Sequence, residues 1–109
     1  MKISVVTVTL NSAATLAATL RSVATQTHAD VEHIIIDGAS VDDTLALVRR
    51  HCRPGARVLS EADVGIYDAM NKGVRLAHGD LVGFLNADDV YENEHVLADV
   101  AAAAADPAV

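Results

Sequence analysis

The sequence predicts an α/β fold in which strands and helices alternate in the order βαβαβαβα around a mostly parallel sheet. Hydrophobic residues make up 51% of the 109 residues but aromatic residues only 3%, so the core must consist of Val, Ile, Leu and Ala. Short β-branched runs alternate with apolar residues at helical spacing. This alternation is typical of parallel sheets with right-handed crossovers. The length fits a single domain over residues 1–109.

The first strand and helix are predicted before residue 27. Residues 3–8 are β-branched and almost continuously apolar, which is typical of a strand that is covered on both faces. Ser12 follows as the expected N-cap of a helix. Leu16 and Leu20 continue the helical spacing until about Gln26.

The later elements repeat this order. Residues 31–36 form a buried strand, which Asp37 and Gly38 close. The sequence SVDD at residues 40–43 matches a capping box, so we expect a helix over residues 44–52. The remaining elements are a short strand, a helix that ends at Gly79, a fourth strand and a final helix, predicted over residues 56–59, 65–79, 81–85 and 92–105.

Polar side chains follow every predicted strand. They are Asn11 after the first strand, Asp37 after the second, Glu61 and Asp63 after the third, and Asp88 and Asp89 after the fourth. Ligands of parallel α/β sheets bind outside the carboxyl ends of the strands, so we expect these groups to meet at one site. Two adjacent carboxylates repel by roughly 4 kcal/mol at ~4 Å and an effective dielectric of about 20. The pair must therefore be solvated, cap a helix or be neutralised by a bound cation.

Each acid also has a purely structural interpretation. Asp89 and Glu92 fit a variant of the capping box, so one carboxylate could cap the final helix while its neighbour faces a ligand. A hard cation needs only one or two carboxylates, because it keeps waters and substrate phosphates in its shell. Asp37 either opens the turn at Gly38 or accepts hydrogen bonds from a nucleobase or ribose. Lys72 is either a solvated charge or a neighbour of this acidic edge.

Composition excludes several classes of function. The net charge of −7 argues against a nucleic-acid surface. The single Cys52 cannot form an internal disulfide, which favours a reducing compartment. No stretch approaches the ~18 apolar residues of a membrane-spanning helix. The five histidines show no metal-ligand spacing.

Three ordered stretches together resemble the donor-binding half of a family 2 glycosyltransferase with the A-type, Rossmann-like fold of nucleotide-diphospho-sugar transferases. They are SVVTVTLNSAATLAATLRSVATQ, VEHIIIDGASVDDT and SEADVGIYDAMNKGVRLAHGDLVGFLNADD. Their wording is similar to enzymes that build bacterial surface polysaccharides, such as those of the colanic acid type. The resemblance implies transfer of a sugar, with inversion, from a nucleotide-diphosphate sugar to a glycan or lipid-linked acceptor, assisted by Mg²⁺ or Mn²⁺. It also implies a cytoplasmic location, including the inner face of the cytoplasmic membrane.

The resemblance implies a role for each candidate residue. Asp89 would be the metal-side acid of a D-x-D-like motif, and Asp88 would face the metal or the ribose. Asp63 would approach the base or the sugar. The implied nucleotide-binding set comprises Thr9, Asn11, Asp37, Asp63, Lys72 and Asp88.

The chain departs from the family pattern in two residues and in length. Gly38 stands where many relatives have a second Asp, which leaves the identity of the base open. Asn86 stands where many have an Asp, which leaves Asp88 and Asp89 as the metal candidates. Family members continue into an acceptor half that supplies the catalytic base, so we expect a truncated donor-binding domain whose base lies beyond Val109. Uncovered apolar surface and a free sheet edge predict self-association.

Two other functions share parts of this pattern. A sugar nucleotidyltransferase would need a Gly-rich phosphate loop with a basic residue directly after the first strand, and TLNSAAT at residues 9–15 has neither. A nucleotide-binding or assembly domain without turnover would retain the same fold, and the sequence does not exclude it.

Overall fold

The computed structural model describes residues 1–105. Strands and helices alternate in the predicted order, which confirms the α/β class. The elements are β1 (Ile3–Thr9), α1 (Leu16–Ala24), β2 (Val31–Asp37), α2 (Thr44–His51), β3 (Arg57–Ser60), α3 (Ile66–Leu76), β4 (Leu81–Phe84) and α4 (Val96–Ala105). Within the described residues, no helix has both the length and the apolar character needed to span a membrane.

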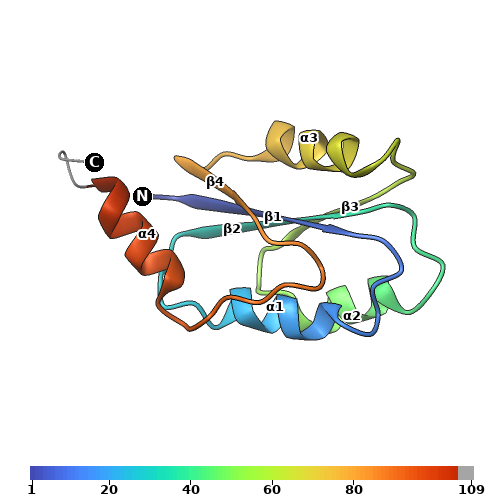
Figure 1. Ribbon diagram of the computed structural model, residues 1–109, viewed down its shortest axis with the longest axis horizontal. Coiled ribbons are helices and arrows are strands. Elements are labelled where there is room, and N and C mark those ends of the chain that lie inside the picture. The colour runs from blue at the N-terminus through green and yellow to red at the C-terminus, as the bar shows by residue number, and fades with distance from the viewer. Residues whose placement is uncertain (106–109) are drawn as a thin grey trace.

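The four strands form one parallel sheet in the order β3-β2-β1-β4. β1 and β2 pair along their whole length and end together at Thr9 and Asp37. β3 reaches the same edge, where Ser60 pairs with Asp37. The carboxyl ends of these strands therefore lie side by side (Figure 1).

Helices cover both faces of the sheet (Figure 1). α3 lies on one face, and α1 and α2 lie on the other. Successive isoleucines of β2 serve both sides, because Ile34 and Ile36 pack with Ala69 of α3, whereas Ile35 packs with Leu20 of α1. This two-sided burial explains why Ile34 to Ile36 form a continuous apolar run rather than an alternating one.

Gly73 lets α3 lie unusually close to β1. A Cβ atom added at this position would stand 2.3 Å from Cγ1 of Val6. No real side chain tolerates that distance, so the helix can rest on the strand only because residue 73 has no side chain. This contact fixes α3 above the sheet.

The predicted start of α1 and the predicted capping box of α2 are wrong. α1 begins at Leu16 rather than after Ser12, whose hydroxyl donates to the carbonyl of Leu10 at 3.0 Å. α2 begins at Thr44 as predicted, but the capping box does not form, because the Ser40 hydroxyl bonds to the carboxylate of Asp37 instead. Both hydroxyls are thus engaged by loops at the ends of the strands.

The last two helices also differ at one end. α4 begins at Val96, four residues after Glu92, so the capping box predicted from Asp89 to Glu92 does not form. α3 ends at Leu76 rather than at Gly79. Gly79 instead lies against Ser4, where an added Cβ would stand 2.6 Å from the backbone nitrogen. Its absent side chain serves packing and not helix termination.

Candidate functional site

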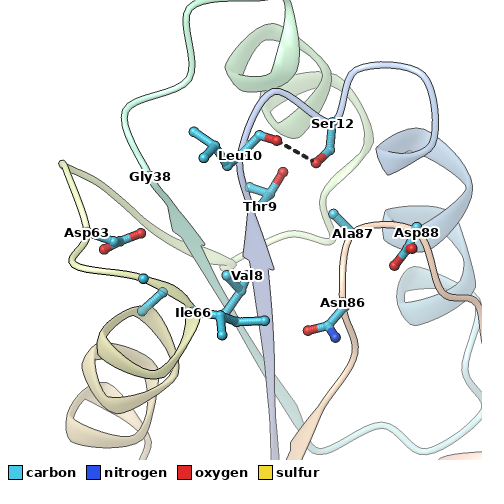
Figure 2. Close-up of a pocket in the computed structure, with 12 residues that line it drawn as sticks. Val8, Thr9, Leu10, Ser12, Gly38, Asp63, Ile66, Asn86, Ala87 and Asp88 are labelled. Atoms are coloured by element: carbon cyan, nitrogen blue, oxygen red, sulfur yellow. Dashed lines mark hydrogen bonds between the residues drawn. The ribbon is translucent and has the colours of Figure 1, made fainter.

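A pocket of about 520 Å³ opens at the carboxyl ends of the strands (Figure 2). Segments that follow all four strands contribute to it, and the first turns of α3 complete its wall. The lining residues are Val8, Thr9, Leu10, Ser12, Gly38, Asp63, Gly65, Ile66, Ala69, Asn86, Ala87 and Asp88. A mostly apolar wall with a few converging polar groups, at this volume, is typical of a small-molecule site. The edge of the sheet is the one that the sequence predicted.

Asp63 brings a carboxylate to one side of the pocket. Its side chain is 11% exposed, and its Oδ1 accepts a hydrogen bond from Nζ of Lys72 at 2.6 Å. Lys72 also contacts the Glu61 carboxylate at 3.2 Å and donates to the carbonyl of Ala62 at 3.0 Å. The hydrogen bond to Asp63 raises the pKa of Lys72, although burial opposes this. Lys72 itself does not line the pocket, so it reaches the site only through Asp63.

Two oxygen atoms at the pocket are buried without a hydrogen-bond partner within residues 1–105. They are Oγ1 of Thr9 and Oδ1 of Asn86. Thr9 is only 2% exposed. An unsatisfied buried polar atom costs roughly 1–3 kcal/mol, so these oxygens mark positions where a bound group would supply the missing contact.

The segment after β4 is fixed by α1. The Thr19 hydroxyl lies 3.0 Å from the carbonyl of Ala87 and 2.6 Å from that of Asp89. The amide of Asp89 donates to the carbonyl of Asn86 at 3.0 Å, which closes a tight turn. Asp88 lines the pocket, whereas Asp89 is exposed and is not among the lining residues.

The oxygen atoms of this turn fit a hard divalent cation of the kind that also holds phosphate and water. Asp88 offers a carboxylate, and Asn86 offers an amide oxygen that lacks a partner among the described residues. In residues 1–105, no group of three His, Cys, Asp or Glu side chains could hold a metal ion alone. A cation here would therefore complete its shell with ligand oxygens, as Mg²⁺ and Mn²⁺ commonly do.

Asp37 ends β2 and is buried, whereas Asn11 follows β1 and is exposed. The Asp37 carboxylate is fully buried and accepts hydrogen bonds from the Ser40 amide at 2.9 Å and the Ser60 hydroxyl at 2.7 Å. Asn11 accepts a hydrogen bond from the Val41 amide at 2.9 Å. Both residues tie neighbouring loops together, and neither lines the pocket. Their contact with a ligand stays a prediction.

The structure thus brings part of the predicted set together. Thr9, Asp63 and Asp88 line the pocket, and Lys72 supports one of them. Sequence reasoning missed the apolar wall, which includes Ile66 and Ala69. The available signal was topological, because the helix that follows β3 must begin at the same edge of the sheet as the acids.

Comparison with known proteins shows the family. The sequence matches the glycosyl transferase family 2 over residues 4–109. It is 44% identical over 102 residues to a PGL/p-HBAD biosynthesis glycosyltransferase of Mycobacterium bovis, an alignment that covers 91% of this chain and 40% of the relative. The chain thus spans about 40% of the length of the curated relatives it first matches. The similarity to colanic acid type enzymes stays an expectation.

Solved structures show the same fold with nucleotide sugars bound. A mannosyltransferase from Pyrobaculum calidifontis, in complex with GDP-Man and Mn²⁺, superposes with a TM-score of 0.87 at 26% identity, covering 99% of this chain and 33% of that one. Residues 1–349 of S. aureus TarS, in complex with UDP-GlcNAc, give a TM-score of 0.83 at 29% identity, covering 94% and 30%. The strand order, the pocket and these likenesses agree: the chain belongs to glycosyl transferase family 2.

Proposed function

We propose that this chain binds the nucleotide-diphosphate sugar donor of an inverting glycosyltransferase, whose acceptor is a glycan or a lipid-linked molecule. The observation that carries the proposal is the pocket at the strand ends, where one carboxylate stands on each side and buried oxygens lack partners within residues 1–105. Its volume of about 520 Å³ suits a ligand of nucleotide size. The bound GDP-Man and UDP-GlcNAc in the two similar structures support the same class of ligand.

The two sides of the pocket suit the two ends of such a donor. Asp63 and Thr9 offer acceptors to N–H and O–H groups of a nucleoside, and Asp37 and Asn11 hold the loops that shape this side. Asp88 and Asn86, on the side of β4, suit the diphosphate with its cation (Figure 2). The ligand would therefore lie across the ends of β1 and β4.

A divalent cation is part of the proposal. The chain carries a net charge of −7, and a diphosphate would be repelled by the acids of the site unless a cation lay between them. Asp88 and Asn86 would hold it, and Asp89, predicted from the sequence as the metal-side acid, stands directly beside them. When bound, the cation would neutralise the charge that develops on the diphosphate leaving group. Mg²⁺ and Mn²⁺ both suit these oxygen ligands.

Titration calorimetry with UDP, GDP and dTDP, each with and without Mn²⁺ or Mg²⁺, tests this function. We expect one diphosphate to bind, and to bind more tightly with the cation. Asp88→Asn and Asp89→Asn should each weaken binding in Mn²⁺, while Asp99→Asn, at an exposed acid of α4, serves as the control. Unchanged affinity in either site variant removes that acid from the metal site. Failure of all three diphosphates to bind contradicts the proposed function.

Self-association also remains a prediction. β4 is an edge strand of the described sheet, and its Val82 and Phe84 are 40% and 44% exposed. An apolar edge strand offers unpaired backbone groups to another chain.

A further inference from the structure

Gly38 is a glycine for reasons of space and not of backbone conformation. The glycines with positive φ in residues 1–105 are Gly55 and Gly65, so the backbone at residue 38 would accept any side chain. A Cβ atom there, however, would stand 3.0 Å from Oδ2 of Asp63 and 3.4 Å from Cδ1 of Leu10. The first distance is tighter than nine in ten real contacts of a Cβ atom, whereas the second is ordinary packing. A side chain at residue 38 would therefore displace the Asp63 carboxylate by a few tenths of an ångström.

The two oxygens of that carboxylate have different surroundings. Oδ1 accepts the hydrogen bond from Lys72 at 2.6 Å. Oδ2 lies against Gly38, which lines the pocket together with Asp63. One oxygen is therefore held by the protein, while the other is presented at the pocket wall as a hydrogen-bond acceptor.

The ammonium of Lys72 contacts several groups of the loop that carries Asp63. Besides Asp63 and Glu61, its ammonium lies 3.6 Å from Oδ2 of Asp68, and it donates to the carbonyl of Ala62 at 3.0 Å. Asp68 in turn accepts the amide of Val64 at 2.9 Å. The Lys72 side chain is only 14% exposed. The ammonium thus gathers the acids and the backbone on both sides of Asp63.

The backbone that carries Lys72 packs closely against the sheet. Lys72 precedes Gly73, the residue through which α3 rests on β1. A lysine next to this contact cannot shift along the strand without moving the helix. The packing of α3 on β1 therefore holds Lys72 in place, and Lys72 in turn holds the Asp63 carboxylate.

We propose that Asp63 is the carboxylate that selects the nucleoside, and that two residues hold it in place for this task. Lys72 is a positioning residue that binds the Asp63 carboxylate, and Gly38 leaves space for it. Oδ2 of Asp63 would accept a hydrogen bond from an N–H group of the base or a hydroxyl of the ribose. Lys72 would touch no ligand and would act only through Asp63. This inference rests on the proposed function, since it names the group that reads the nucleoside end of the donor.

The test is a set of double-mutant cycles on nucleotide affinity. Dissociation constants for UDP, GDP and dTDP in Mn²⁺ are measured for Lys72→Met, Gly38→Ala and Asp63→Ala, and for each of the first two combined with Asp63→Ala. Each single variant should weaken the best-bound diphosphate about tenfold, as expected for loss of one hydrogen bond to a charged group. Each variant should also reduce the ratio by which the best-bound diphosphate is preferred over the other two diphosphates.

The combined variants show whether Lys72 and Gly38 act through Asp63 or by another route. If Lys72 and Gly38 act through Asp63, adding either change to Asp63→Ala should cost no further affinity. Arg75→Met, which removes an exposed charge from the same helix, should leave affinity and preference unchanged. The 2′-deoxy and 3′-deoxy analogues of the best diphosphate identify the donor: a ribose hydroxyl is the partner if an analogue loses affinity in the unaltered chain but not in Asp63→Ala, and a base N–H otherwise.

Several results would overturn the inference. If Lys72→Met keeps the affinity and preference of the unaltered chain, Lys72 positions nothing that the ligand contacts. If its cost adds fully to that of Asp63→Ala, Lys72 acts by another route. Should Lys72→Met fail to fold by circular dichroism, the Gly38→Ala cycle decides alone, because it leaves the contacts of Lys72 in place. Absence of binding by the unaltered chain would instead refute the proposed function.

Discussion

Acidification should destabilise this protein before its carboxylates titrate, because β2 buries a histidine. His33 is 1% exposed, and its Nε2 shares a hydrogen bond of 2.8 Å with the hydroxyl of Thr7. Its Nδ1 is buried without a partner among residues 1–105. Burial, with a smaller effect from the charge of Arg53, lowers the pKa of His33 from 6.5 to about 4. The folded chain therefore holds a neutral imidazole at physiological pH.

The sign and the size of the effect follow from the two pKa values. Below pH 6.5 the unfolded chain binds a proton at His33, while the folded chain binds one only below about pH 4. The unfolded state thus holds more protons in this window, so the free energy of unfolding falls as the pH falls. At about 1.36 kcal/mol per pKa unit, the full loss is roughly 3 kcal/mol, of which about 2 kcal/mol is lost by pH 5. That is a large part of the total stability of an ordinary domain.

Urea unfolding followed by circular dichroism between pH 7.5 and pH 5 measures this loss. The unaltered chain should lose about 2 kcal/mol over the window, and His33→Gln should show a much flatter dependence, whatever its stability at pH 7.5. His95→Gln, at a side chain that is 59% exposed, should keep the slope of the unaltered chain. A flat profile for the unaltered chain, or an unchanged slope in His33→Gln, would refute the reasoning.

Three further predictions concern packing, binding and turnover. Gly73→Ala should lower the free energy of unfolding by about 1–3 kcal/mol through overpacking, whereas Gly83→Ala, where an added Cβ meets nothing within 4 Å among the described residues, should change it little in the same urea titrations. Thr9→Val should leave stability unchanged or higher, because it removes an unsatisfied hydroxyl, yet weaken nucleotide binding by calorimetry; equal affinity would remove Thr9 from the site. Residues 1–109 alone should transfer no sugar to glycan or lipid-linked acceptors, because a positioned base contributes about 10²–10⁴-fold; acceptor-dependent turnover that matches a chain extended past Val109 would contradict this.

The strands could be predicted from the sequence because burial on both faces leaves a clear pattern. Ile34, Ile35 and Ile36 follow one another without a polar residue, and the structure uses alternate members on opposite faces. The groups that cap the helices could not be predicted in the same way. Ser40 looks like a capping group, but its hydroxyl bonds to Asp37. Asp42, which the capping box left without a role, accepts from the Thr44 amide and from the Ala13 amide at 3.3 Å. Such side chains can form hydrogen bonds with partners near or far along the chain, and the sequence alone does not identify the distant partners.

The position of the site followed from topology, but the direction of each side chain did not. Asp37 and Gly38 are neighbours, yet the Asp37 carboxylate is buried among serines while Gly38 lines the pocket. At the end of a strand, neighbouring residues point in different directions, so one can be buried while the next faces the pocket. The contact between Lys72 and Asp63 was equally hidden, because it joins a helix to the loop before it across nine positions.

The sequence predicts a single acidic edge, whereas the structure divides the acids between two sides of the pocket. We assign nucleoside binding to one side and cation binding to the other. Figure 2 shows Asp63 on the α3 side of the pocket and Asp88 on the β4 side, with the end of β1 between them. Lys72 forms salt bridges with Asp63, Glu61 and Asp68, whereas the segment of Asp88 and Asp89 shows no salt bridge within the described residues. On the β4 side no salt bridge within residues 1–105 offsets the carboxylates, so a bound cation is favoured there. It follows that loss of the Asp63 carboxylate should weaken nucleoside and nucleotide alike without altering the need for Mn²⁺, while loss of the Asp88 carboxylate should spare the nucleoside and weaken only the diphosphate.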